Sequence, residues 1–293
     1  MGLAAAALLA TSCTAPRVIN VTGKVTPRGE IRGGGNMSFN VATETIGKTG
    51  SALLQAAKDA ADKDTVGYSG TIDKLQVAAL AYVLDPVRPT SDLYLRYGVI
   101  DRLDVGYKYA FGSHVFDAMY QFAGPTGTVE RPGGPARATY ASIGLQFATQ
   151  RAKLPSIPFL DDVNDVLGFR ATRKDLVIPL VVSHSFGAEE EIGAFSYGVV
   201  YSRSFMRYGF TPGNVFEGRV KVPELPLQRV SYNSFGAFAN AKIGYRYVYF
   251  LPAVGLYYQN YGTYALLQNK SAQLSGLTIV PSIGLQFRVP KSK

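Results

Sequence analysis

The sequence predicts an all-β protein, a closed antiparallel barrel of about 12 strands within a range of about 10 to 12, with a short helix in an early loop. Beyond residue 28, apolar and polar residues alternate with a period of two, the pattern of strands that have two different faces. Gly, Asn, Asp and Pro separate the alternating stretches, as expected of turns. Several stretches run for about 9 to 13 residues, close to the length that crosses a bilayer at a tilt.

The N-terminus predicts export from the cytoplasm. Residues 1–12 carry no charge and are too short to span a bilayer as a helix, so they are interpreted as a signal peptide. The run Leu9 to Cys13 resembles the lipobox of bacterial lipoproteins, which implies lipidation of Cys13. Ordinary cleavage after Ala15, without a lipid, is the alternative. Residues 13–28 are then expected to form an N-terminal tether.

Residues 29–289 are expected to form the barrel, followed by a tail at 290–293. The clearest strands follow one another between residues 92 and 122. Apolar residues occupy every second position there, and the turns between strands have about two or three residues. Similar alternation recurs at 141–147, 195–201, 235–243 and 277–289. It is less regular at 30–42, 72–84, 175–186 and 248–261, which are further strand candidates.

Three segments lack the alternation. Residues 49–65 are rich in helix formers such as Ala and Leu, and predict a helical loop or a plug in the barrel mouth. The proline-containing segments 150–174 and 209–228 predict two long loops. Short turns that alternate with long loops are typical of a membrane barrel.

The second face of the strands is rich in Gly and carries charged residues. Charges in a dry core are costly unless they are paired, whereas a wet or ion-paired lumen accommodates them. We therefore expect the apolar face to point outward, toward lipid. The candidate lumen-facing residues are Arg96, Asp104, Lys108, Gln146, Lys242 and Arg288.

The chain has 19 Tyr and no Trp, and the Tyr residues gather near strand ends. A tyrosine ring is apolar and its hydroxyl is polar, which suits the boundary between lipid and water. The candidate interfacial residues are Tyr94, Tyr107, Tyr109, Tyr247, Tyr257 and Tyr258.

The hairpin YLRYGVIDRLDVGYKYAFG at 94–112 and the last strand LTIVPSIGLQFRV at 277–289 give the chain a resemblance to bacterial outer-membrane β-barrel proteins as a class. The resemblance covers most of residues 29–289 and implies a location in the outer membrane with lipid as a partner. In that class the last strand commonly ends in an aromatic residue. Here Phe287 is followed by six further residues, which departs from the pattern.

The sequence contains no clear motif for a catalytic site or a metal site. Lipid esterases of this class place a Ser two residues from a His on one strand, but His184 has Phe186 there and His114 has Phe116. We therefore expect no enzyme and no cofactor, and retain a lipid esterase that uses His184 as an alternative. The acidic runs at 161–165 and 189–191 are expected to be solvated loops, with Ca²⁺ binding as the alternative.

The sequence thus favours a narrow pore or transport-related channel, whose basic lining would prefer anions. A structural barrel that anchors an envelope protein complex through its long loops is the alternative, and a lipid-tethered soluble barrel that binds a small apolar ligand is a further one. The net charge is +9, but the basic residues are scattered with no run of five, so nucleic acid is not expected as a partner. One Cys excludes a disulfide scaffold.

Overall fold

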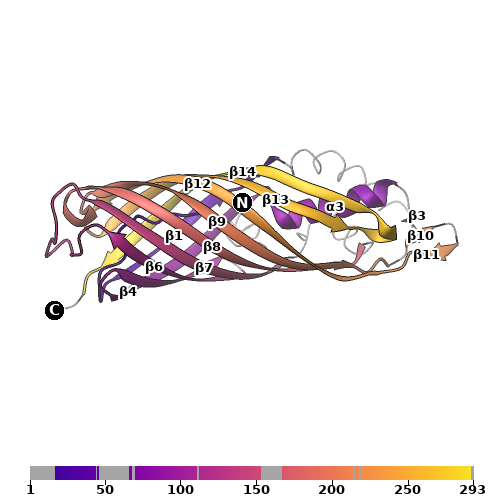
Figure 1. The fold of residues 1–293 in the computed structure, drawn as a ribbon, viewed down its shortest axis with the longest axis horizontal. Coiled ribbons are helices and arrows are strands. Elements are labelled where there is room, and N and C mark those ends of the chain that lie inside the picture. Colours follow the sequence, from indigo (N-terminus) through magenta and orange to yellow (C-terminus); the bar gives the residue numbers. More distant parts are fainter. Residues whose placement is uncertain are drawn as a thin grey trace, which may run out of the picture.

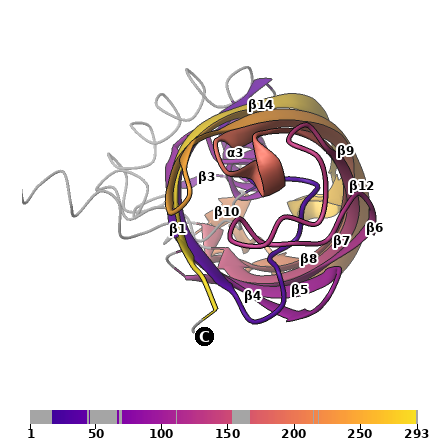
Figure 2. The same ribbon diagram turned by 90° about the vertical axis from the view of Figure 1, so that its left-hand side faces the viewer.

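A computed structural model describes residues 17–43, 45, 66–67, 70–110, 112–152, 167–213, 215–217 and 219–291. Antiparallel strands close into a barrel when β1 pairs with β14 along Ile31↔Val289 to Ser38↔Ser282 (Figures 1 and 2). In spatial order, the strands are β1 (Ile31–Phe39), β4 (Pro89–Ile100), β5 (Leu103–Ala110), β6 (Ser113–Ala123), β7 (Thr139–Ala152), β8 (Phe169–Phe186), β9 (Gly193–Phe210), β12 (Leu225–Tyr245), β13 (Val248–Ala265) and β14 (Ser271–Val289).

The closed barrel therefore has 10 strands in the described residues, so the prediction of about 12 was not exact. The short strand β2 (Val41–Ala42) pairs with β14 in the register that β1 set. The segment 72–84, expected to be a strand, is instead the helix α3 (Gly70–Leu84). Its run of Ala and Leu residues favours a helix, and tertiary packing buries most of its sides. The helix predicted within 49–65 lies outside the described residues.

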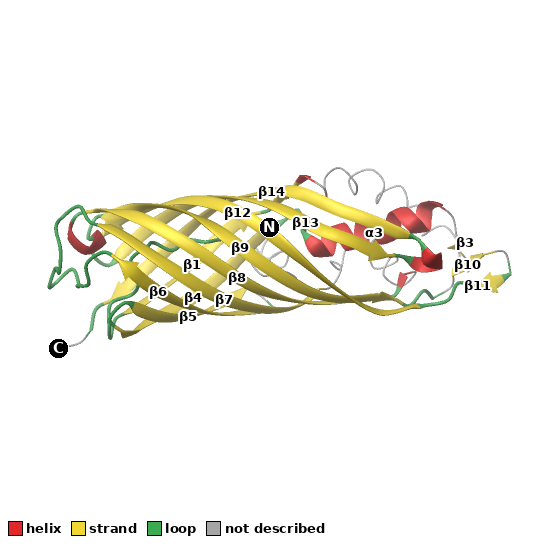
Figure 3. Ribbon diagram, in the orientation of Figure 1, coloured by secondary structure: helices red, strands yellow, loops and turns green. Residues whose placement is uncertain are grey.

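The barrel wall has uneven height (Figure 3). Strands β1, β4, β5 and β6 have 8 to 12 residues, whereas β8, β9, β12, β13 and β14 have 18 to 21. We call the end where the long strands project, with residues 169–175, 203–210, 225–233, 259–265 and 271–277, the long-strand end. The opposite end, with the turns at 101–102 and 246–247, is the short-turn end.

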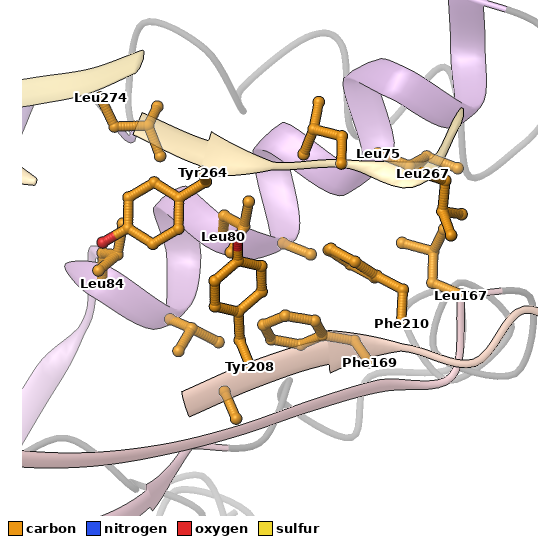
Figure 4. Close-up of a cluster of buried hydrophobic side chains, with 14 of the residues drawn as sticks. Leu75, Leu80, Leu84, Leu167, Phe169, Tyr208, Phe210, Tyr264, Leu267 and Leu274 are labelled. Atoms are coloured by element: carbon orange, nitrogen blue, oxygen red, sulfur yellow. The ribbon is translucent and has the colours of Figure 1, made fainter. Parts of the chain in front are cut away.

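Helix α3 packs against the inner side of the projecting strands (Figure 4). Leu75, Leu80 and Leu84 of the helix are fully buried against aromatic side chains of the strands, among them Tyr208 and Tyr264. A small sheet of β3 (Val66–Gly67), β10 (Val215–Glu217) and β11 (Val220–Lys221) lies at the same end, and the 3-10 turn η2 (Leu267–Asn269) joins β13 to β14 (Figure 1).

Both predicted long loops are shorter than expected, because the strands beside them continue further. Strand β7 runs to Ala152 and β8 begins at Phe169, so residues 150–152 and 169–174 are strand, while 153–166 lie outside the described residues. Likewise β9 ends at Phe210 and β12 begins at Leu225, and β10 and β11 lie between them. The sequence did not reveal these strand ends, because their outward positions carry polar residues such as Arg170 and Arg229 in place of the apolar residues of the belt.

The outer surface of the barrel is an apolar belt. Leu93 is 60% exposed, Phe235 60% and Leu285 50%, and every described strand of the barrel adds such residues. A soluble protein would hide rows of this size in a core, whereas a membrane barrel shows them to lipid. No helix in the described ranges is long and apolar enough to cross a membrane.

Candidate functional site

Residues 17–28, which we call the lumenal segment, run through the interior of the barrel. The segment begins beside the end of α3, where Arg17 forms a 2.8 Å ion pair with Asp85. It ends at the short-turn end, where Arg28 bridges to Gly98 of β4. Figure 2, which looks in from the short-turn end, shows the indigo chain crossing the barrel interior. Residues 13–28 were expected to form an N-terminal tether, but the described part of this stretch, from residue 17 on, lies inside the barrel.

Apolar contacts hold the middle of the lumenal segment. Val18, Ile19 and Val25 are buried in one cluster with inward residues of the wall, including Val181 and Phe238. Glycine makes room for the chain on both sides. A Cβ on Gly98 would lie 2.0 Å from the carbonyl oxygen of Pro27, and one on Gly23 would lie 2.5 Å from that of Tyr140.

The backbone of the segment is bound mainly by side chains of the wall rather than by a β-ladder. Asn240 Nδ2 donates to the carbonyl oxygens of Ile19 at 3.3 Å and Val21 at 3.0 Å. Lys108 Nζ donates to the carbonyl of Val18 at 3.3 Å. The Thr26 amide donates to Asp104 Oδ2 at 2.7 Å. The segment therefore lies in the barrel as a separate strip of chain whose removal would break no strand pairing.

Two buried carboxylates reach into the lumen from the 3-10 turn η1 (Ala188–Glu190), which joins β8 to β9. Glu189 forms an ion pair with Lys24 of the segment. Glu190 forms a 3.0 Å ion pair with Lys242 of β12 and accepts a 3.0 Å hydrogen bond from Thr22 Oγ1. The expectation of a solvated acidic loop is wrong for these two residues, which are 3% and 0% exposed. Their burial is compensated by the facing ammonium groups.

The wall carries a second set of ion pairs. Arg96 of β4 binds both Asp104 of β5 and Asp117 of β6. At the short-turn end, Arg288 of β14 binds Glu30 and Glu130. Hydrogen bonds from the Arg288 guanidinium lower the pKa of Glu130, which lies in the loop between β6 and β7, to about 2. Arg96 and Arg288 thus each face two carboxylates, which compensate their positive charge.

Little space is left beside the first part of the segment, whereas a cavity of about 200 Å³ lies beside Lys24, Val25, Pro27 and Arg28 near the short-turn end. Near Asn20, Thr22 and Lys24 the remaining cavity has a volume of about 10 Å³, and near Arg17 and Ile19 it is about 30 Å³. A cavity needs about 10 to 15 Å³ to hold one water molecule. Among the described residues, the lumen beside residues 17–24 therefore has room for no more than a few water molecules.

The six candidate lumen-facing residues all point inward. Arg96, Asp104, Gln146, Lys242 and Arg288 are buried, and the half-buried Lys108 contacts the lumenal segment.

The candidate interfacial tyrosines divide into two groups. The outward members are Tyr107, Tyr109, Tyr247 and Tyr258. The interfacial assignment was wrong for Tyr94 and Tyr257, which point into the barrel. Tyr94 accepts a 3.1 Å hydrogen bond from Gln286, and the Tyr257 hydroxyl donates to the carbonyl of Arg17. Each occupies an inward position of its strand, which the position of a Tyr near a strand end does not reveal.

The residues around His184 do not form a nucleophile–base pair with serine. His184 faces outward, whereas Ser183 and Ser185 are buried on the inner face of β8. The ring contacts Thr139 Oγ1 at 2.9 Å and the Tyr197 hydroxyl at 3.5 Å. Within the described residues, no group of three or more His, Cys, Asp or Glu side chains is placed to hold a metal ion. Cys13 and the predicted signal peptide lie outside the described residues.

The sequence interpretation missed Lys24, Glu189 and Glu190. One signal in the sequence pointed to such residues: a lysine that faces inward, Lys242, needs a carboxylate within reach. No periodic pattern marks residues 17–28, because an irregular chain inside a barrel has no strand face of its own.

No protein family matches the sequence, and no curated protein matches it either. Among solved structures, the chain is similar to Ail, the attachment invasion locus protein of Yersinia pestis, with 9% identity, a TM-score of 0.31, and coverage of 89% of this chain and 99% of Ail. A major outer membrane protein from Thermus thermophilus gives 11% identity, a TM-score of 0.34, and coverage of 89% and 100%. The outer membrane protein OprG from Pseudomonas aeruginosa has 8% identity and a TM-score of 0.27, with coverage of 92% of this chain and 99% of OprG. Likeness at these scores adds nothing to what the barrel itself shows.

The barrel and its belt establish the location. A closed antiparallel barrel leaves no unpaired strand edge, which is the condition for crossing lipid with strands. Its outer face is apolar and its interior is polar and ion-paired. This is the architecture of a protein of the bacterial outer membrane, where the chain lies.

Proposed function

We propose that the protein is a gated barrel of the outer membrane, closed at rest by its own lumenal segment and transport-related when the segment moves. The observation that carries the proposal is the way in which the segment is held. Side-chain hydrogen bonds and ion pairs attach it to the wall, while the strand ladders of the barrel do not include it.

Displacement of such a segment is feasible for a physical reason. Water entering the lumen can replace each polar contact that the segment loses. The net cost is then about 1 kcal/mol for a bond between neutral groups and about 1.5 to 3 kcal/mol for a bond with a charged group. The barrel itself would remain intact, because no described strand pairing depends on residues 17–27.

The expected anion preference is not part of this proposal. It rested on a basic lining, but Arg96, Lys242 and Arg288 each face a carboxylate. An opened lumen would present both signs of charge to a passing solute, and a small polar solute of either sign suits it.

The test is the conductance of the refolded full chain in planar bilayers. We expect the wild type to stay at baseline, and Lys24→Glu to show discrete openings, because the new carboxylate repels Glu189 across the contact. Arg137→Glu, in an exposed loop at the same end, is the matched control and should stay closed. The double variant Lys24→Glu with Glu189→Lys restores opposite charges and should return toward baseline. Openings in the wild type, or a silent Lys24→Glu variant that folds normally, would contradict the proposal.

A structural barrel is the second candidate, and the filled lumen favours it as well. Helix α3 and the sheet of β3, β10 and β11 form a layer at the long-strand end that a partner protein could contact (Figure 1). A barrel that stays silent in every segment variant, yet retains a partner on purification through residues 215–221, would favour this candidate.

A further inference from the structure

A groove on the outside of the barrel lies across β8, β9 and β12 at the long-strand end, beyond the apolar belt. It has a volume of about 400 Å³. Its lining includes the outward side chains of Thr172, Lys174, Phe205, Arg207, Arg229 and Ser231. We call this the basic groove. It is independent of the lumen and of the lumenal segment.

Like charges stand side by side in the basic groove. Arg207 of β9 is in register with Arg229 of β12 on one side and with Thr172 of β8 on the other. Lys174 lies one outward position further along β8. Like charges directly opposite each other on neighbouring strands are destabilising. An anion lying between them would remove this cost.

The described part of the protein does not supply that anion. The outward positions of 170–174, 203–209 and 227–233 contain no Asp or Glu. No described carboxylate forms an ion pair with Lys174, Arg207 or Arg229.

Two exposed cations elsewhere on the molecule have carboxylate partners. Arg246 pairs with Glu191 at 2.6 Å and Lys270 pairs with Asp73 at 2.5 Å, although both cations are about half exposed. Among the described residues, exposed cations without an ion pair also occur singly elsewhere, as at Arg137 and Arg170. The local property of the groove is that two such cations, Arg207 and Arg229, lie directly opposite each other.

The groove lies close to the apolar belt, separated from it by one row formed by Leu176, Arg203 and Asn233. Two register rows below Lys174, Ile178 of β8, Tyr201 of β9 and Phe235 of β12 lie side by side and face lipid. The Tyr201 hydroxyl donates to Asn233 Oδ1 at 2.9 Å, which marks the change from apolar to polar. On β13 and β14, Asn260, Gln273 and Ser275 occupy outward positions past the belt, so no cations continue the cluster there.

We propose that the basic groove binds the headgroup of a membrane lipid that carries two or more phosphate groups, with its acyl chains lying along the belt below. Arginine matches phosphate oxygens with two parallel hydrogen bonds, and Arg207 and Arg229 present two such groups together. A lipid fits better than a free phosphate compound because apolar surface begins close to the cations. In a bacterial membrane barrel the short turns face the periplasm, so the long-strand end faces outward and the lipid belongs to the outer leaflet.

The test is a titration of the full barrel, in neutral detergent at low salt, with bisphosphorylated lipid A as the probe. Circular dichroism follows the thermal unfolding midpoint, and the midpoint shift gives an apparent affinity. We expect a rise for the wild type and, for the double variant Arg207→Gln with Arg229→Gln, an affinity at least about tenfold lower. Arg137→Gln, an exposed arginine at the short-turn end, is the matched control and should behave as the wild type. Added salt should weaken the wild-type effect.

Two comparison ligands separate the alternatives. A zwitterionic lipid with the same acyl chains should shift the midpoint much less, since it lacks the net anionic charge. Free pyrophosphate should also shift it less, since it lacks the chains. An equal response to pyrophosphate would show that the groove takes soluble phosphates, and an equal response of the double variant to lipid A would show that the groove is not the site. Either result would overturn the proposal.

Discussion

Arg96 lies on the inner face of β4, within reach of Asp104 on β5 and Asp117 on β6. All three side chains are nearly inaccessible to solvent. Charges in such a position are stable only as a set, because removal of one partner leaves the others buried and uncompensated. Asp104 also accepts the Thr26 amide, so this set joins three strands of the wall to the lumenal segment.

Replacement of Arg96 is therefore expected to be costly. Arg96→Met should lower the free energy of unfolding by about 3 to 5 kcal/mol, because two carboxylates lose their counter-charge. Urea unfolding of the barrel in detergent, read by the heat-dependent shift in gel mobility, measures this. Arg219→Met, at an exposed position outside the barrel wall, should change stability by no more than about 0.5 kcal/mol. Equal effects of the two substitutions would contradict the role given to the ion pairs.

Glu130 gives the short-turn end a dependence on acid pH. Its pKa is lowered in the folded state to about 2 by hydrogen bonds from Arg288, so the contact contributes stability in full above the unfolded pKa of about 4.5. That contribution is lost as the pH falls from about 4.5 toward 2. Glu130→Gln should flatten this part of the pH–stability curve, measured by urea unfolding between pH 6 and 2. A variant with the wild-type curve would contradict the assignment.

At the residue scale, the sequence predicts inward charge better than aromatic position. Alternation alone places Arg96, Asp104 and Lys242 opposite the apolar face, because lipid tolerates no unpaired charge in the belt. It does not place Tyr94 or Tyr257, since tyrosine suits either side of the wall. It also cannot pair Glu190 with Lys242, since 52 residues separate them in sequence.

Helix α3 is the element that fills the long-strand end. Its buried face meets the inward aromatic residues of the projecting strands, so helix and strands stabilise one another above the belt (Figure 4). The strands alone would expose Tyr208, Phe210 and Tyr264 to water on their inner side.

Leu80→Ala should loosen the long-strand end without opening the barrel. Leu80 is fully buried, and truncation of such a side chain costs about 2 to 5 kcal/mol of local stability. Limited proteolysis should cut the projecting strands faster, while the heat-dependent mobility shift of the barrel stays unchanged. Lys74→Ala, on the exposed side of the same helix, is the control. Unchanged proteolysis in Leu80→Ala would show that the helix does not protect these strands.

The sequence predicted the strands of the belt more reliably than the elements beyond it. Within the belt, lipid on one side and a polar lumen on the other impose strict alternation. Past the belt, water lies outside and α3 lies inside, so the outward positions become polar and the strand ends resemble loops. The stretch 72–84 resembled a strand because burial on most sides removes the helical spacing of polar residues.

As a whole molecule, the protein combines a lipid-facing wall with an interior occupied by its own chain. The wall needs no partner to satisfy its backbone, because β1 and β14 close it. The interior is filled by residues 17–28 and by the carboxylates of η1. A closed barrel of this kind can transport only if the lumenal segment moves, so its function depends on where that segment lies.

The most direct measurement of that position is the reactivity of Thr22→Cys in a Cys13→Ser background, with the barrel folded in liposomes. A small polar maleimide should modify this thiol far more slowly than Arg137→Cys in the exposed loop, because Thr22 is 8% exposed inside the wall. Unfolding in urea should make the two thiols equally reactive. If Thr22→Cys reacts as fast as Arg137→Cys in the folded barrel, the segment does not occupy the lumen and the account is wrong.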